Sequence, residues 1–135
     1  MPANTSPIFP LTPNISWATV TTANTAKDGT GAVVTVFTAG ANGSRVDYLK
    51  VRALGTNVAT VLRVFVNNGG ANTTAANNSL ILDQTIAATT NSETAQLVDN
   101  IIQLDLSLPA GYKINVTIGT TVAAGLQVTG VGGDY

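Results

Sequence analysis

Short runs in which apolar and polar residues alternate recur along this chain, and they indicate strands throughout. Between Ile102 and Leu108, aliphatic residues occupy every second position, with Gln103, Asp105 and Ser107 between them. A period of two residues places the aliphatic side chains on one face of a β-strand. Val and Thr, whose branching at Cβ favours strands, recur in these runs, and no segment has convincing helical periodicity.

Turn-forming residues separate the runs. Among them Asn42-Gly43 is the strongest hairpin signal, because both residues accept a positive φ. The sequence therefore predicts an all-β fold, an antiparallel β-sandwich of jelly-roll type with about eight strands. An immunoglobulin-like sandwich is the alternative. The predicted strands are 16–25, 32–39, 44–54, 58–67, 79–89, 96–107, 112–119 and 125–132.

Two segments depart from the regular pattern. The stretch Asn68–Asn78 is too long and too polar for a tight turn, which indicates either an exposed functional loop or a disordered excursion. Alternation also fails within 44–54, where Tyr48 and Leu49 are apolar neighbours. A β-bulge or burial of both faces of this strand would account for the failure.

The run Leu62–Val66 carries apolar residues on both faces. Phe65 shares one face with Arg63, opposite the aliphatic residues. Something must therefore cover the outside of this strand, and we expect a neighbouring subunit to do so. Arg63 and Phe65 are the predicted residues of that interface, and a homotrimer is the expected assembly. The alternative is that loops of the same chain cover the strand.

The first 13 residues contain four of the five prolines, Pro2, Pro7, Pro10 and Pro13. Proline fixes φ and biases the preceding residue toward extended conformations. We therefore expect residues 1–15 to form an extended N-terminal arm, followed by a β-sandwich domain over 16–135.

The arm is unusually apolar for a tail, because the first charged side chain of the sequence is Lys27. Ile8, Phe9, Leu11 and Trp17 are the predicted contacts of this region with a partner. The alternative is that the arm packs along its own domain.

Composition excludes several classes of chemistry. The chain has no Cys and no His, which removes thiolate nucleophiles, imidazole bases, disulfides and Cys/His metal sites. Only 10% of residues are charged and the net charge is −1, which argues against binding to nucleic acid. No apolar run is long enough to span a membrane, and residues 1–17 lack the basic and apolar regions that we would expect of a secretory signal. We therefore expect a non-enzymatic protein with no cofactor and no metal.

Weak signals of chemistry have simpler explanations. Asp28-Gly29-Thr30-Gly31 has a turn composition, and its order is wrong for an aspartic-protease site. The carboxylates are scattered singly, so an acid pair for hydrolysis would have to be assembled by folding. A sugar site would need aromatic rings, and the candidates are Trp17, Tyr48, Tyr112 and Tyr135.

Three segments together resemble small structural proteins of tailed bacteriophages, some of which decorate or cement capsids. They are MPANTSPIFPLTPNISW, TTANTAKDGTGAVVTVFTAGANGSRVDYLKVRALGT and LPAGYKINVTIGT with the closing GVGGDY. The resemblance implies a β-sandwich component of the head or tail, made in the bacterial cytoplasm and incorporated into the virion. It carries over no catalytic residue.

The expected function is that of a virion structural protein. It would decorate or cement the capsid, with itself and the major capsid protein or other virion proteins as partners. The alternative is a tail or head-fibre module that binds cell-surface glycans through the Asn68–Asn78 loop and exposed tyrosines. A hydrolase with an acid pair is the third and weakest hypothesis.

Overall fold

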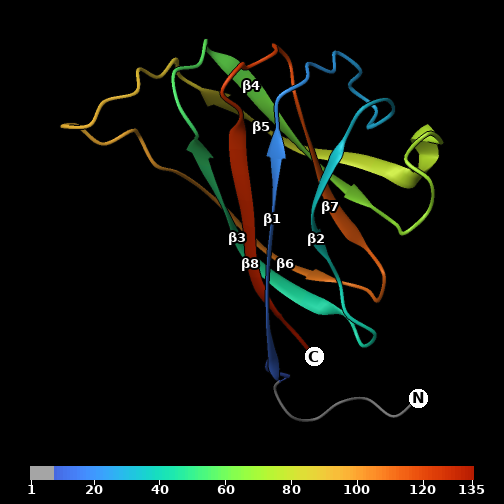
Figure 1. Ribbon diagram of the computed structural model, residues 1–135. Helices are drawn as coiled ribbons and strands as arrows, with labels where there is room; N and C mark the ends of the chain where they lie inside the picture. Colours follow the sequence, from blue (N-terminus) through green and yellow to red (C-terminus); the bar gives the residue numbers. More distant parts are fainter. Residues whose placement is uncertain (1–7) are drawn as a thin grey trace, which may run out of the picture.

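The computed structural model describes residues 8–135, which form eight antiparallel strands and one short 3₁₀ turn (Figure 1). The strand positions follow the alternating runs of the sequence. The strands are β1 (Thr12–Val20), β2 (Val34–Thr38), β3 (Ser44–Ala53), β4 (Thr60–Asn67), β5 (Asn78–Ile86), β6 (Asn100–Leu108), β7 (Lys113–Ile118) and β8 (Leu126–Asp134), and the turn η1 is Ala75–Asn77.

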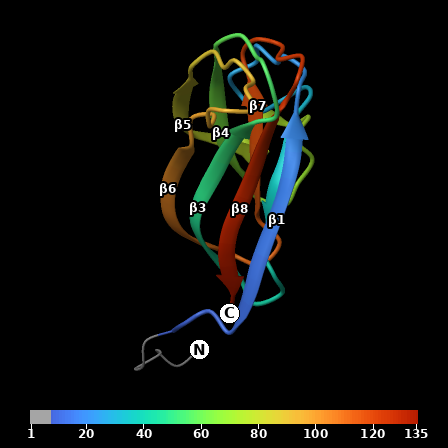
Figure 2. The same ribbon diagram turned by 60° about the vertical axis from the view of Figure 1, so that its left-hand side comes forward.

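Two four-stranded sheets pack face to face. The first, here called the β1 sheet, has the order β1-β8-β3-β6, and the second, the β2 sheet, has the order β2-β7-β4-β5. Figure 2 shows the four strands of the β1 sheet side by side on one face of the molecule. The predicted antiparallel β-sandwich of eight strands is confirmed. The jelly-roll topology stays a prediction, and the two strand orders are compatible with it.

The core lies between the two sheets and is built from the inward half of each alternating run. Its completely buried side chains include Leu49 of β3, Leu62 of β4 and Ile114 of β7. Burying a side chain of this size stabilises the fold by about 1.5–3 kcal/mol. The remaining half of each run points outward, so what covers each outer face decides how the protein meets its surroundings.

Each strand overlaps its predicted position, and the largest shifts are in β1 and at the start of β6, which begins at Asn100 and not at 96. β1 begins at Thr12, four residues before its predicted start, and pairs with β8 from Thr12↔Asp134 to Val20↔Leu126. Residues 12–15, which the sequence analysis assigned to the arm, are therefore part of the sheet. Residues 1–7 of the predicted arm lie outside the described residues.

The turn at Asn42-Gly43 forms, but it does not make a hairpin. Gly43 has φ +87° and its N–H donates to the Gly40 carbonyl oxygen at 3.1 Å. The flanking strands β2 and β3 belong to different sheets, so this turn carries the chain across the sandwich. β3 instead pairs with β8 and β6, and Ser44 at its start fixes the corner by donating to Asp134.

The irregularity predicted within 44–54 is a β-bulge. The register of β3 shifts between Val46 and Tyr48: Asp47 is an extra residue relative to β8, whereas two residues of β6, Leu104 and Asp105, stand opposite it. A bulge at this point explains why the buried positions of β3 change from Ser44 and Val46 to Leu49 and Val51. It also brings the β3 backbone close to β8, where a Cβ on Gly132 would lie 2.0 Å from the Arg45 carbonyl oxygen.

Candidate docking surface

The outer face of the β1 sheet carries two rows of large side chains across all four strands. One row is Ile15, Val131, Tyr48 and Gln103, and the next is Trp17, Thr129, Lys50 and Ile101. Residues that stand directly opposite one another on paired strands point to the same face of a sheet. We call this surface, with the charged residues that border it, the β1-sheet face.

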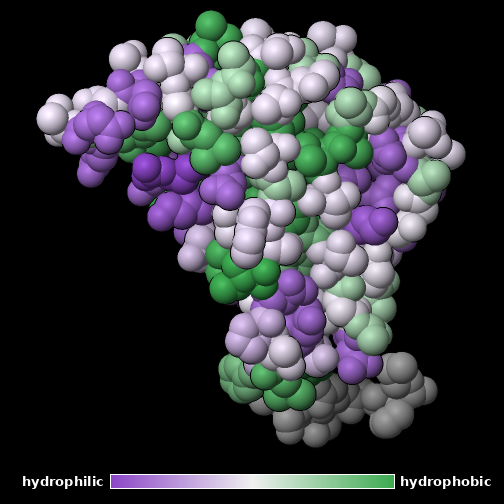
Figure 3. Space-filling view, viewed as in Figure 1, coloured by the Kyte–Doolittle hydropathy of each residue, from purple (hydrophilic) through white to green (hydrophobic). Residues whose placement is uncertain are grey.

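Apolar side chains on this face are open to solvent. Ile15 and Trp17 at the β1 end and Ile101 at the β6 end are each more than half exposed. The described part of the N-terminal segment continues the exposure, with Ile8, Phe9 and Leu11 between 62% and 83% exposed. In Figure 3 apolar residues gather at the lower end of the molecule, where β1 begins, with further groups above them. Exposed apolar groups of this extent are typical of interaction surfaces.

Charged side chains on the same face neutralise one another. Arg45 lies 3.1 Å from the Asp47 carboxylate and 3.4 Å from that of Asp105. At the other end of the face, Arg52 and Lys50 both contact Asp99. The hydrogen bond from Arg52 lowers the pKa of the Asp99 carboxyl from its ordinary value. Three cations and three anions thus leave the face with no net charge.

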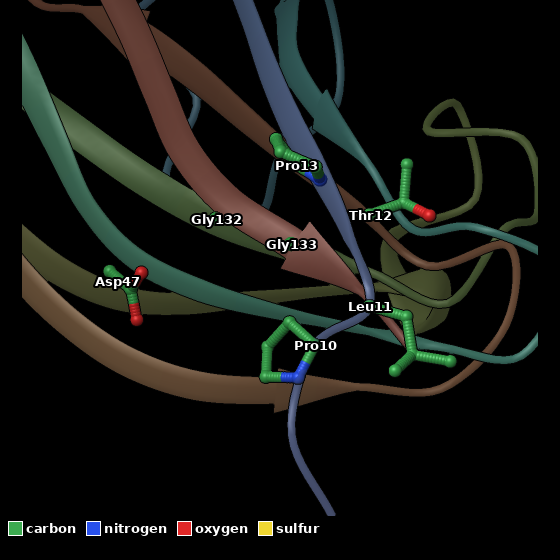
Figure 4. A pocket seen from close by; sticks show the side chains of 7 residues that line it. All are labelled: Pro10, Leu11, Thr12, Pro13, Asp47, Gly132 and Gly133. Atoms are coloured by element: carbon green, nitrogen blue, oxygen red, sulfur yellow. The ribbon is translucent and has the colours of Figure 1, made fainter.

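The N-terminal segment is held against the lower end of this face. The Leu11 N–H donates to the Asp134 carbonyl oxygen at 2.7 Å, and Pro10 sits so close to Gly133 that a Cβ there would lie 2.5 Å from it. Figure 4 shows Pro10 and Leu11 beside the end of β8, with Asp47 of β3 on the other side of that strand end. These residues line a groove of about 280 Å³. The start of the chain is therefore continuous with the β1-sheet face.

A polar cluster at this end fixes β1 to its neighbours. The Asp134 carboxylate accepts hydrogen bonds from the Ser44 hydroxyl and from the Asn14 amide, and these bonds lower the pKa of Asp134. Asn14 also donates to the Thr38 carbonyl oxygen, and Ser16 donates to that of Val36 at 2.6 Å. β1 is thus tied to both sheets, so its outward side chains sit on a fixed support.

The second pair of predicted contacts is in a different environment. Phe65 points to the outer face of the β2 sheet, since its neighbours Val64 and Val66 in β4 pack against the core, yet it is completely buried. The Arg63 side chain is only 12% exposed and donates to the Asn24 carbonyl oxygen at 3.4 Å. The predicted interface at Arg63 and Phe65 is therefore wrong for Phe65, because its own chain covers it.

Two connections provide this cover. The β1–β2 connection, residues 21–33, bonds to the end of β7, where the Asn24 N–H donates to the Ile118 carbonyl oxygen at 2.7 Å. Asn72, in the β4–β5 connection, donates to the carbonyl oxygens of Gly29 and Gly31. Asn78 donates to that of Asp28 at 3.1 Å. The two connections are thus fastened to each other over the β2 sheet.

The Asn68–Asn78 segment is an ordered connection rather than an excursion. It joins β4 and β5, which are neighbours in the sheet, and its asparagines bond within the segment. The Asn68 N–H donates to the Asn77 carbonyl oxygen, and the Asn77 amide donates to the Ala71 carbonyl oxygen at 2.9 Å. These internal bonds occupy polar groups that a glycan-binding loop would present to its ligand.

Sequence reasoning did not assign Ile15, Ile101 or Val131 to the predicted contacts, and it considered Tyr48 only for a sugar site. Ile15 and Trp17 were grouped with the arm, but both lie within β1. Strand order brings β1 and β6 to the two edges of one sheet, and no local pattern encodes that order. The exposed apolar residues of β6 offered a signal, since Ile101 breaks the alternation that begins at Ile102.

Within residues 8–135, no three side chains among His, Cys, Asp and Glu are grouped so as to hold a metal ion. The same residues contain no helix that is long and apolar enough to cross a membrane.

Of the tyrosines considered for a sugar site, Tyr112 packs against the core. Trp17 and Tyr48 are in adjacent rows of the β1-sheet face. Comparison of the chain with protein-family models, with curated proteins and with solved structures finds no match.

Proposed function

We propose that this chain is a non-enzymatic structural protein of a tailed-phage virion that decorates or cements the capsid. The observation that carries the proposal is the continuous apolar surface formed by residues 8–11 and the outward side chains of β1. The resemblance of the sequence to phage structural proteins is the reason for proposing that the particle is a phage virion. The proposed partners are the major capsid protein, other virion proteins and further copies of this chain.

Attachment in this proposal comes from buried apolar area and not from charge. Each exposed side chain that is removed from water contributes about 25 cal/mol per Å² of apolar surface. Repetition on a symmetric shell then adds many modest contacts into stable attachment. The polar cluster around Asp134 supports this mechanism, because it holds the start of β1 in place and so spares part of the ordering cost on binding.

The first test is whether the protein is present in purified particles of a phage that encodes it, at a fixed copy number by quantitative mass spectrometry. Its absence from such particles contradicts the proposal.

The second test uses particles that lack the protein. We expect wild-type protein to rebind them and the variant Ile8→Ser/Phe9→Ser to lose binding. Val58→Thr is the control, since Val58 is exposed but lies in the β3–β4 connection. The substitutions spare Leu11 and Pro10, which the structure ties to β8. Equal rebinding of all three proteins removes the N-terminal segment from the mechanism.

A glycan-binding module of a tail or head fibre stays the second candidate. The exposed Trp17 on the β1-sheet face favours it, because sugar rings stack on aromatic side chains. The internal hydrogen bonds of the 68–78 segment weigh against the loop that we expected to bind the glycan. A glycan array with wild-type protein and Trp17→Thr separates this candidate from the structural role.

A further inference from the structure

We infer that the β1-sheet face docks on the same face of a second copy of this chain, about a two-fold axis that runs along the strands. The inference deepens the proposed function by naming one of its partners. It rests on the arrangement of exposed residues across the sheet, on their area and on the charge balance of the face.

The arrangement is self-complementary. Trp17 on β1 and Ile101 on β6 stand at opposite ends of one row, with Thr129 and Lys50 between them. A two-fold axis parallel to the strands, midway between β8 and β3, exchanges the two ends of every row. Trp17 of one copy then faces Ile101 of the other, and the same contact forms twice. Strand directions stay aligned in this arrangement, which is a common geometry for stacked sheets.

The exposed area is near what a stable interface requires. Six large apolar side chains lie on the β1-sheet face or on the N-terminal segment that continues from it, and each is at least 55% exposed. At roughly 100 Å² each they present on the order of 600 Å² in one copy, close to the ~800 Å² that each partner buries in an interface of standard size. The six are Ile8, Phe9, Leu11, Ile15, Trp17 and Ile101.

The charges permit an identical partner. Arg45, Lys50 and Arg52 are already paired with Asp47, Asp99 and Asp105 on the same face. A surface with no net charge does not repel its own copy, and it gains nothing from a strongly charged partner. The whole chain has a net charge of only −1, so long-range repulsion between copies is also small.

The β2 sheet offers a smaller apolar surface, since Leu80 and Ile81 of its edge strand β5 are only 40% and 37% exposed. Phe65 on the outer face of that sheet is completely buried beneath the chain's own connections, so it offers no apolar surface to a second copy. The homotrimer expected from the sequence used Arg63 and Phe65 as its interface. The two-fold arrangement replaces that interface with one built from residues that solvent reaches.

The test is sedimentation equilibrium of the full chain, from low concentrations up to about 0.5 mM. We expect a dimer for the wild type and for Val58→Thr, an exposed apolar residue outside the face. Trp17→Lys alone and Ile101→Asp alone should each weaken the dimer about tenfold or more. The combined variant Trp17→Lys/Ile101→Asp should recover most of the affinity, because the axis places each lysine opposite an aspartate.

Several results overturn the inference. They are a wild type that stays monomeric, a trimer, a dimer insensitive to both single variants, and a combined variant that is no tighter than the single ones. Circular dichroism of every variant checks that each is folded, and the double variant keeps the test decisive. A monomer whose Trp17 fluorescence responds to added oligosaccharide contradicts the inference and favours the glycan candidate.

The two proposals fail separately. A dimer that is absent from virions contradicts the structural role in the particle and leaves the self-association standing. A protein that occupies virions but is monomeric in solution, and is unaffected by Trp17→Lys, contradicts only the two-fold docking.

Discussion

The two outer faces of the sandwich differ in how far they expose an outward aromatic side chain to solvent. Phe65 on β4 is completely buried, whereas Trp17 on β1 is 62% exposed. The strands themselves are alike, so the difference lies in the connections. Residues 21–33 and 68–77 fold over the β2 sheet and are fastened to each other by Asn72 and Asn78. Among the described residues no connection covers the β1 sheet in this way, so its outward apolar side chains stay open to solvent.

The largest expected difference in stability is between substitutions of Phe65 and of Trp17. Phe65→Ala should lower the free energy of unfolding by about 3–5 kcal/mol, because it removes a buried ring and leaves a cavity. Trp17→Ala should change it by no more than about 0.5 kcal/mol in the monomer, since solvent already surrounds most of that side chain. Urea unfolding at low protein concentration measures both. Equal losses would mean that the two faces do not differ as described.

A smaller loss of stability is expected when the hydrogen bonds that hold residues 21–33 over the β2 sheet are removed. Asn78→Ala removes the donors to Asp28 and Asn72 and the acceptor for the Asn67 amide. Leaving these groups without partners should cost about 1–3 kcal/mol and speed hydrogen exchange in residues 21–33. Asn91→Ala is the matched control, since Asn91 is exposed and bonds to the Thr56 hydroxyl through its backbone N–H, which the substitution keeps. Unchanged exchange in residues 21–33 of Asn78→Ala would show that the asparagines do not hold the cover.

Local sequence predicted the strands well but not their partners. The run from Ile102 to Leu108 was recognised from alternation alone, and β6 occupies Asn100–Leu108. Asn42-Gly43 gave the turn correctly, yet the flanking strands separate into different sheets, because long-range pairing of β3 with β8 and β6 overrides the hairpin. The pattern around Phe65 correctly required a cover, but the sequence did not distinguish a neighbouring subunit from the chain's own loops.

Only part of the candidate docking surface could be predicted from the sequence. Ile8, Phe9, Leu11 and Trp17 were recognised because apolar residues are unexpected in a proline-rich tail. Ile101 was not, because its importance depends on β6 lying three strands away from β1 in the same sheet. Proximity of this kind is set by the order of strands, which arises from packing of the whole chain.

Low pH should weaken the polar cluster around Asp134, which holds the start of β1 in place. Hydrogen bonds from Ser44 and Asn14 lower the pKa of Asp134 below its ordinary value of 3.8. The stabilisation is therefore complete above the ordinary value and is lost as the pH falls through the lower folded value. We expect the urea midpoint of the wild type to fall further between about pH 6 and about pH 3 than that of Asp134→Asn. Parallel curves for the two proteins would show that Asp134 does not support β1 through its charge.

The smallest change in stability is expected from substituting the charged residues of the β1-sheet face. Arg52→Gln removes the contact of Arg52 with Asp99, a pair in which both side chains are well exposed. Exposed ion pairs gain little, because water screens them and ordering two long side chains has an entropic cost. The urea midpoint of the monomer should therefore stay within experimental error of the wild type, with or without added salt. A loss as large as that of Asn78→Ala would mean that the β1-sheet face stabilises the monomer through its own surface residues. The contrast with the covered face would then fail, since that contrast requires the outward residues of β1 and β3 to be available to a partner at little cost to the fold.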